Sequence, residues 1–208
     1  MNTVTSTEYD GPLGPILLTF IDDALVRLDV AHDGIDLARA EISQRLGVVP
    51  EPDPSVGESL ATQLDEYFAG DRRTFDVALD WRLVRGFTRA ALEATIRIPY
   101  GEVASYGEVA LMADAPRAAR AVGTACASSP FSIVVPVHRV VRADGSIGEY
   151  GGHPEVKEHL LDLESRAVLG EGLRAAGWRR WLRRGAAVSG GVGQGEAARR
   201  RVGLCAAD

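Results

Sequence analysis

The segment Ile133–Val141 has the sequence Ile-Val-Val-Pro-Val-His-Arg-Val-Val and is the most informative stretch of the chain. Its apolar, mostly β-branched residues predict a short buried strand, and Pro136 ends the first apolar run. The strand would deliver His138 and Arg139 to a loop or helix start. Active sites often lie where a buried strand ends in titratable residues. A core strand that ends in a hydrogen-bonded histidine fits this segment equally well, so the flanking sequence must decide.

Residues 1–82 have the pattern of a small α/β domain. Strands are predicted where apolar residues alternate with period two, and helices where they recur every three or four residues. The predicted elements are paired strands within residues 7–31, helices at Ile35–Leu46 and Gly57–Phe68, and a strand at Thr74–Leu79. Because no phosphate-binding loop or carboxylate pair occurs in this part, we interpret it as a scaffold domain.

Residues 83–166 are predicted to form a second, mainly helical domain. The predicted helices are Phe87–Ile98, Tyr106–Met112, Arg117–Cys126 and Val156–Leu163, with Ser105 as the N-cap of the second. A tight turn joins the second and third helices, which predicts a helix-turn-helix. Small residues give Arg117–Cys126 a low profile from which two arginines project, so this helix suits a DNA groove. A closely packed alanine-rich helix with solvated arginines is the alternative interpretation.

The composition of the 208-residue chain, with 46% hydrophobic and 25% charged residues, is typical of a soluble globular protein. No apolar run reaches the roughly 18 residues of a membrane span, and the polar N-terminus does not resemble a signal peptide. We therefore expect a cytoplasmic monomer without a membrane partner. The net charge of −6 argues against strong non-specific DNA binding. Cys126 and Cys205 predict no disulfide framework, and no cluster has zinc-ligand spacing, so no metal or other cofactor is expected.

The C-terminal residues 167–208 differ in composition from the rest of the chain. From Arg166 onward there are nine arginines and three acidic residues, with many glycines and small side chains. We expect a largely disordered tail. Arginines mixed with tryptophans at Trp178–Arg184 could contact phosphates or a membrane surface, whereas a solvated extension without a specific role is the alternative.

Taken in order, these motifs resemble the alkylguanine–DNA alkyltransferase family, the methylated-DNA–protein-cysteine methyltransferases. The resemblance covers roughly residues 8–166. The matching positions are Pro12–Pro15, Glu66–Gly70, Ile98–Glu102, Ser105, Tyr106, Ala118–Gly123, Ile133–Val141, Gly148, Tyr150–Gly152, Lys157 and Glu164. The resemblance implies a ribonuclease-H-like α/β domain at the N-terminus, followed by a mainly α winged helix-turn-helix domain.

The resemblance also implies how these residues act on double-stranded DNA. A guanine alkylated at its exocyclic oxygen is rotated out of the stack into a protein pocket. Arg120 matches the arginine that fills the gap from the minor groove, and Tyr106 matches the tyrosine that helps to turn the nucleotide. Tyr150 and Gly151 match the pocket wall. The other assigned residues are Ser129 and Arg139 for DNA contacts and Cys126 for the base pocket. Ser129 replaces an asparagine that is common in the family, and can supply only part of its hydrogen bonds.

The family transfers the alkyl group to a cysteine thiolate, and the corresponding position departs from the family pattern here. A histidine draws off the thiol proton through a water and a glutamate orients that histidine; His138 and Glu164 match these two residues. The acceptor position itself is occupied by Val137, which carries no nucleophile. Because valine is close to cysteine in volume, the pocket should persist. This combination resembles the alkyltransferase-like proteins, which lack the cysteine and mark lesions for other repair proteins.

Three hypotheses follow from the sequence. The first is a protein that binds alkylated guanine in DNA without transferring the alkyl group, and that works with other repair proteins. The second is a methyltransferase with a relocated acceptor, for which Cys126 is the candidate within the resembling region; packing is the simpler interpretation of this cysteine. The third is a degenerate helix-turn-helix protein that binds DNA without recognising lesions.

Overall fold

The N-terminal part folds as a sheet because three consecutive segments are rich in apolar and β-branched residues and are separated by tight turns. The computed structural model describes residues 3–169 of the chain. Strands β1 (Val4–Gly11), β2 (Gly14–Ile21) and β3 (Ala24–Val30) form an antiparallel meander, and the short β4 (Glu51–Pro52) pairs parallel to β1. Asp22 and Asp23 turn the chain between β2 and β3 with φ values of 48° and 67°. Aspartate tolerates this left-handed region better than most residues, so two successive aspartates can make this turn.

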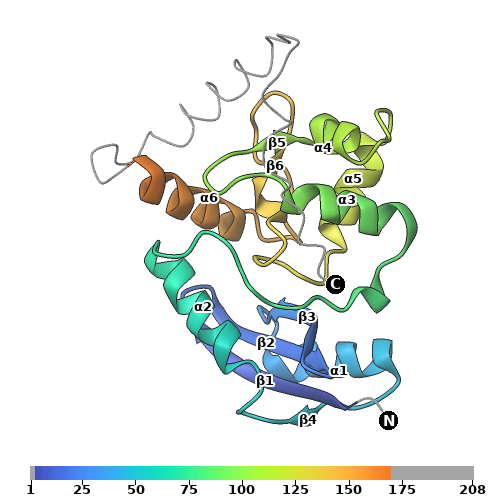
Figure 1. The fold of residues 1–208 in the computed structure, drawn as a ribbon, viewed down its shortest axis with the longest axis vertical. Coiled ribbons are helices and arrows are strands. Elements are labelled where there is room, and N and C mark those ends of the chain that lie inside the picture. The colour runs from blue at the N-terminus through green and yellow to red at the C-terminus, as the bar shows by residue number, and fades with distance from the viewer. Residues whose placement is uncertain (1–2, 170–208) are drawn as a thin grey trace, which may run out of the picture.

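Both faces of β2 are covered, so its run of apolar residues is continuous. Leu17 packs with Ala38 and Ile42 of helix α1 (Ile35–Leu46) on one face. Ile16 and Leu18 belong to the main core on the other face, together with residues of helix α2 (Glu58–Ala69). Figure 1 shows α2 lying along the sheet. The predicted helix Ile35–Leu46 has the same bounds as α1, and the predicted helix Gly57–Phe68 differs from α2 by one residue at each end.

The strand predicted at Thr74–Leu79 is wrong, because this segment is irregular apart from a single bridge between Leu79 and Leu25. A side chain takes the place of a neighbouring strand. Gln63 accepts a hydrogen bond from the backbone N–H of Asp76 at 2.6 Å and donates one to its carbonyl at 3.0 Å. Since Gln63 satisfies both backbone groups, the segment is stabilised without a sheet ladder.

The second part of the described chain is mainly helical, as predicted, and its helices α3, α4 and α5 pack around a small apolar core. The elements are the 3₁₀ turn η1 (Trp81–Leu83), α3 (Gly86–Ile96), β5 (Ala104–Ser105), α4 (Tyr106–Met112), α5 (Ala119–Ala127), η2 (Val137–Arg139), β6 (Val140–Val141) and α6 (Pro154–Leu169). The four predicted helices therefore exist: α4 has the predicted bounds, and the ends of the other three are shifted. α6 continues to Leu169 beyond the predicted tail boundary at residue 167, while Trp178–Arg184 lies outside the described residues. No helix within residues 3–169 is long and apolar enough to cross a membrane.

The segment Ile133–Val141 is buried, as the sequence indicates, but most of it is not a strand. Ile133 has φ 73°, Val135 donates its N–H to the carbonyl of Phe131 at 2.7 Å, and residues 137–139 form a 3₁₀ turn. Val140–Val141 pairs parallel to β5, and Val135 makes one isolated bridge with Ser132. Because the backbone bonds to itself over two to four residues here, it cannot pair along its length with another strand. The tight path brings Val137 and His138 to the interior together.

The N-terminus of α4 gives a direct test of how local sequence stabilises this fold. Ser105 accepts a hydrogen bond from the N–H of Glu108 at 3.2 Å, and the Glu108 carboxylate accepts one from the N–H of Ser105 at 2.7 Å. Replacing Ser105 with alanine removes one half of this capping box. We expect Ser105→Ala to lower the free energy of unfolding by about 0.5–2 kcal/mol in urea denaturation. Ser43→Ala is the control, because the Ser43 hydroxyl near the end of α1 bonds only to the Arg39 carbonyl of its own helix and caps no N–H group. It should change stability by less, and equal losses would contradict the assignment.

Candidate functional site

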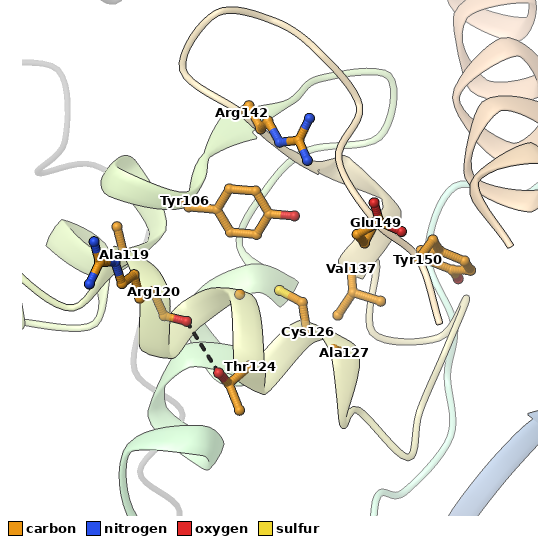
Figure 2. A pocket seen from close by; sticks show the side chains of 11 residues that line it. Tyr106, Ala119, Arg120, Thr124, Cys126, Ala127, Val137, Arg142, Glu149 and Tyr150 are labelled. Atoms are coloured by element: carbon orange, nitrogen blue, oxygen red, sulfur yellow. Dashed lines mark hydrogen bonds between the residues drawn. The ribbon is translucent and has the colours of Figure 1, made fainter. Parts of the chain in front are cut away.

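A pocket of about 590 Å³ opens beside α5 and contains most of the residues singled out by the sequence. Five predicted site residues line it: Tyr106, Arg120, Cys126, Val137 and Tyr150. Figure 2 shows these side chains around one space, contributed by α4, α5, η2 and the loop before α6. Two charged residues that sequence reasoning did not single out, Arg142 and Glu149, also line the pocket. Their positions next to the motifs that end at Val141 and begin at Tyr150 were the available signal.

Small residues allow the pocket walls to approach one another. The backbone of Gly123 on α5 lies against the Tyr106 ring, where a Cβ would be 3.8 Å from the ring edge. Gly148 is more restrictive, because it has φ +70° and a Cβ would lie 3.0 Å from the Tyr106 hydroxyl oxygen. Only glycine fits both the left-handed backbone and this approach without strain. The loop that carries Tyr150 is thereby held close to α4.

A second cleft of about 230 Å³ adjoins the pocket and shares Cys126, Val137 and Tyr150 with it. Ser129 and Gly151 line this cleft rather than the pocket. The Ser129 hydroxyl accepts a hydrogen bond from the Phe131 N–H at 3.3 Å, so it stabilises the turn that follows α5. The structure therefore brings Ser129 and Gly151 next to the pocket without placing them in its wall.

Behind Val137 lies a buried carboxylate that accepts hydrogen bonds from several segments. Glu164 of α6 accepts bonds at Oε1 from His138 Nε2 and the Tyr67 hydroxyl, both at 2.8 Å. The Arg139 guanidinium bonds to both carboxylate oxygens, with Nη2 at 2.9 Å and Nε at 3.0 Å, and the Gly101 N–H donates to Oε2 at 2.9 Å. The side chains of His138 and Glu164 are 0% and 1% exposed. Such a charge is tolerated in the interior only because it is paired and hydrogen-bonded.

The electrostatics of this network fix the protonation states. Burial alone would raise the pKa of Glu164. The hydrogen bonds and charges of His138 and Arg139 lower this pKa by more than burial raises it, so the net shift is downward and the carboxylate is ionised. Burial lowers the pKa of His138, although Glu164 opposes this, so the imidazole is neutral at pH 7. An ionised carboxylate can only accept, so Nε2 carries the proton. Nδ1 of His138 is then the nitrogen with a free lone pair, and it has no hydrogen-bond partner within residues 3–169.

Arg139 differs from the DNA contact expected for it. Its side chain is 7% exposed, and its Nη1 donates to the carbonyl of Ile98 at 2.7 Å in addition to the bonds with Glu164. Each of its three nitrogens donates to a buried acceptor, so the guanidinium is directed into the interior rather than toward a phosphate. Sequence reasoning placed Arg139 on the surface since it could not know that Glu164 packs against it. We correct its role to one of positioning the buried carboxylate.

Comparisons with known proteins agree with this architecture. Residues 4–81 match the family model described as the 6-O-methylguanine DNA methyltransferase, ribonuclease-like domain, and residues 86–166 match that of its DNA binding domain. The fold class expected from the sequence, an α/β ribonuclease-like domain followed by a helical DNA-binding domain, is thereby confirmed. Within residues 3–169 there is no group of three or more histidine, cysteine, aspartate or glutamate residues that could hold a metal ion.

Individual relatives cover nearly the same region. The methylated-DNA–protein-cysteine methyltransferase of Mycobacterium tuberculosis is 40% identical over 159 residues, which are 76% of this chain and 91% of the relative. The constitutive enzyme of Bacillus subtilis is 34% identical over 79% of this chain and 96% of its own length. The crystal structure of the M. tuberculosis O6-methylguanine methyltransferase has a TM-score of 0.69 at 38% identity, covering 79% and 94% of the two chains. The chain belongs to the O6-alkylguanine–DNA alkyltransferase family.

The buried carboxylate gives a prediction with a defined pH dependence. Replacing Glu164 with glutamine leaves Arg139 without a counter-charge in the interior, which should lower the free energy of unfolding by about 3–5 kcal/mol at pH 7. Because the pKa of Glu164 is lowered by folding, its contribution is present above the ordinary value of 4.5 and is lost as the pH falls below it. The difference between wild type and Glu164→Gln in urea unfolding should therefore shrink below pH 4.5.

Glu93→Gln is the matched control for this charge change. Glu93 pairs with Arg89 on an exposed face of α3, so its loss should cost less than about 1 kcal/mol. Equal destabilisation by the two variants, or a difference that grows on acidification, would contradict the role given to Glu164.

Proposed function

We propose that this DNA-repair family member binds alkylated guanine in double-stranded DNA, holds the flipped nucleotide in the pocket beside Val137, and does not transfer the alkyl group. The observation that carries the proposal is the position of Val137. Its side chain is buried at the pocket wall, 3% exposed, directly before His138 in the chain. By the family resemblance this is the position of the acceptor cysteine, and valine offers no lone pair with which to attack an alkyl carbon.

The surroundings of Val137 support retention of lesion binding. The pocket of about 590 Å³ is large enough for a small ligand and is walled by the aromatic rings of Tyr106 and Tyr150, which suit a flat base. Arg120 is exposed at the start of α5 on the rim of this pocket, where a cation can enter the space vacated in DNA. A solved M. tuberculosis relative with a TM-score of 0.67 is described as being in complex with DNA.

Selective binding is the first test. An O6-methylguanine duplex should bind more tightly than the same duplex with unmodified guanine, because extrusion of a mispaired base costs less. Arg120→Ala should weaken binding of the modified duplex about ten- to a hundredfold, since a charged hydrogen bond contributes about 1.5–3 kcal/mol. Fluorescence anisotropy at fixed salt measures both.

Arg45→Ala is the control for net charge, because Arg45 is exposed on the last turn of α1, far along the chain from α5. It should bind as wild type does. Equal affinity for the two duplexes would reject lesion recognition and favour a helix-turn-helix protein that binds DNA without it.

Restoring a thiol is the second test. In Val137→Cys the new Sγ would lie next to His138, whose Nδ1 retains a lone pair that can accept the thiol proton through a water. The thiolate then attacks the alkyl carbon, and the bond between this carbon and the guanine O6 breaks. The guanine anion that remains in the DNA takes up the proton that the thiol gave up. Intact-mass spectrometry after incubation with O6-methylguanine duplex should show a gain of one CH₂ group on Val137→Cys. Val137→Ala, which changes the same site without a nucleophile, should show none; absence of a gain on both would contradict an intact activating network.

Alkyl transfer to Cys126 is a second candidate function, favoured by the position of this residue in the same pocket as Val137. Burial raises the pKa of the Cys126 thiol to about 11, and Lys157 lowers it only in part, so the thiol is neutral at pH 7. A neutral thiol is a poor nucleophile, which is why we favour lesion binding alone. A mass gain on the wild-type protein that disappears in Cys126→Ser would establish the second function in place of the first.

A further inference from the structure

Two histidines from different domains stack against each other beside the pocket. The rings of His32 and His153 have centroids 3.7 Å apart and an interplanar angle of 21°. His32 follows β3 of the N-terminal domain, and His153 immediately precedes α6 of the C-terminal domain. Both line the cleft of about 230 Å³ that adjoins the base pocket and shares Val137 and Tyr150 with it. The stack therefore joins the scaffold domain to the edge of the site.

His153 is coupled to the pocket wall through the backbone. Its N–H donates to the carbonyl of Tyr150 at 2.8 Å, so a displacement of His153 also moves Tyr150, whose ring lines the pocket. Gly151 and Gly152 lie between them with φ values of +57° and +87°, and no atom lies within 4 Å of where their Cβ atoms would be. Because these glycines contribute no side-chain packing, the loop depends on contacts at its ends. His32 is itself held by donation of its N–H to the Val30 carbonyl at 3.0 Å.

We propose that the His32–His153 stack is a positioning contact that holds residues 148–153, with Tyr150, against the N-terminal domain and makes lesion binding weaken as the pH falls through the histidine range. The effect on lesion binding rests on the proposed function. The positioning of residues 148–153 by the stack is a property of the protein without DNA and does not depend on that function. Two neutral imidazoles, or one neutral and one charged, can stack face to face, whereas two imidazolium ions repel each other at this distance.

Charged groups around the stack set the direction of this dependence. Glu155 accepts a hydrogen bond from His153 Nδ1 at 2.9 Å, and Asp33 follows His32 in the chain. Asp29 and Glu41 line the neighbouring surface, where both are paired with Arg27. Burial and His153 lower the pKa of His32, and Glu155 and Asp33 only partly offset this, so the net shift is downward from 6.5. A lowered histidine pKa means that the contact is fully present above the ordinary value and is lost as the pH falls below it.

Hydrogen–deuterium exchange of the free protein tests the contact without DNA. Protection factors of the amides at residues 148–153, corrected for the intrinsic pH dependence of exchange, are compared at about pH 7.5 and pH 5.5, on either side of the histidine range. Wild type should lose protection about two- to tenfold at the lower pH, the size of an aromatic pair contact. His32→Ala should show the lower protection at both pH values. Unchanged protection in His32→Ala at pH 7.5, or in wild type at pH 5.5, would overturn the proposal.

Two further variants separate the stack from general effects of acid. His32→Phe keeps an aromatic face that cannot be protonated, so protection should stay high at both pH values. His159→Gln removes an exposed histidine of α6 away from the stack and should behave as wild type. The assignment would be contradicted if His32→Phe lost protection on acidification. It would also be contradicted if His159→Gln kept full protection at the lower pH.

Binding of the O6-methylguanine duplex by wild type, His32→Ala and His32→Phe completes the test. Affinity should fall at about pH 5.5 for wild type but not for His32→Phe, and it should be low for His32→Ala at both pH values. Wild-type affinity in His32→Ala would overturn the effect on binding. If no variant prefers the modified duplex, the proposed function fails, while the exchange data still decide whether the stack positions the loop.

Discussion

The buried carboxylate of Glu164 is the interaction on which the arrangement of both domains depends. Its donors come from α2, from the loop before β5, and from η2, while Glu164 itself lies on α6. An isolated charge of this kind would be costly in the interior, so the carboxylate depends on all of these donors together. The network thereby fixes the position of η2, and with it the orientation of Val137 toward the pocket. Chemistry at the pocket and the packing of the domains are maintained by the same group.

This position at the carboxylate offers a physical reason why His138 and Arg139 accompany an apolar residue at position 137. His138 bonds to Glu164 and lies at hydrogen-bond distance from Tyr67, and Arg139 neutralises the carboxylate. Removal of any one leaves a buried polar group unpaired, which costs about 1–3 kcal/mol or more for a charge. Stability alone can therefore preserve them. Their presence is compatible with transfer and with binding, and under the proposed function it is Val137 that excludes transfer.

Local patterns predicted much of the fold, whereas contacts between distant residues were beyond them. The bounds of α1 and α4 agree with the sequence because periodicity and caps are properties of neighbouring residues. The strand predicted at Thr74–Leu79 is wrong because Gln63, on α2, supplies hydrogen bonds that a neighbouring strand would otherwise make. Arg139 was misplaced for the same reason, since its partner Glu164 is remote in sequence. The pocket residues came from ordered motifs, but Arg142, Glu149 and the stacked histidines became visible only in three dimensions.

The main apolar core is not confined to either domain. Leu18 of β2 and Leu64 of α2 belong to the same cluster as Phe131, Val135 and Leu160 of the second half. Separating the halves would expose apolar surface on both sides and would strip Tyr67 from Glu164 at the same time. The boundary between the two family domains is therefore not a boundary between two separate cores. Across residues 3–169 we expect the two halves to unfold together, so that damage to the scaffold is felt at the pocket.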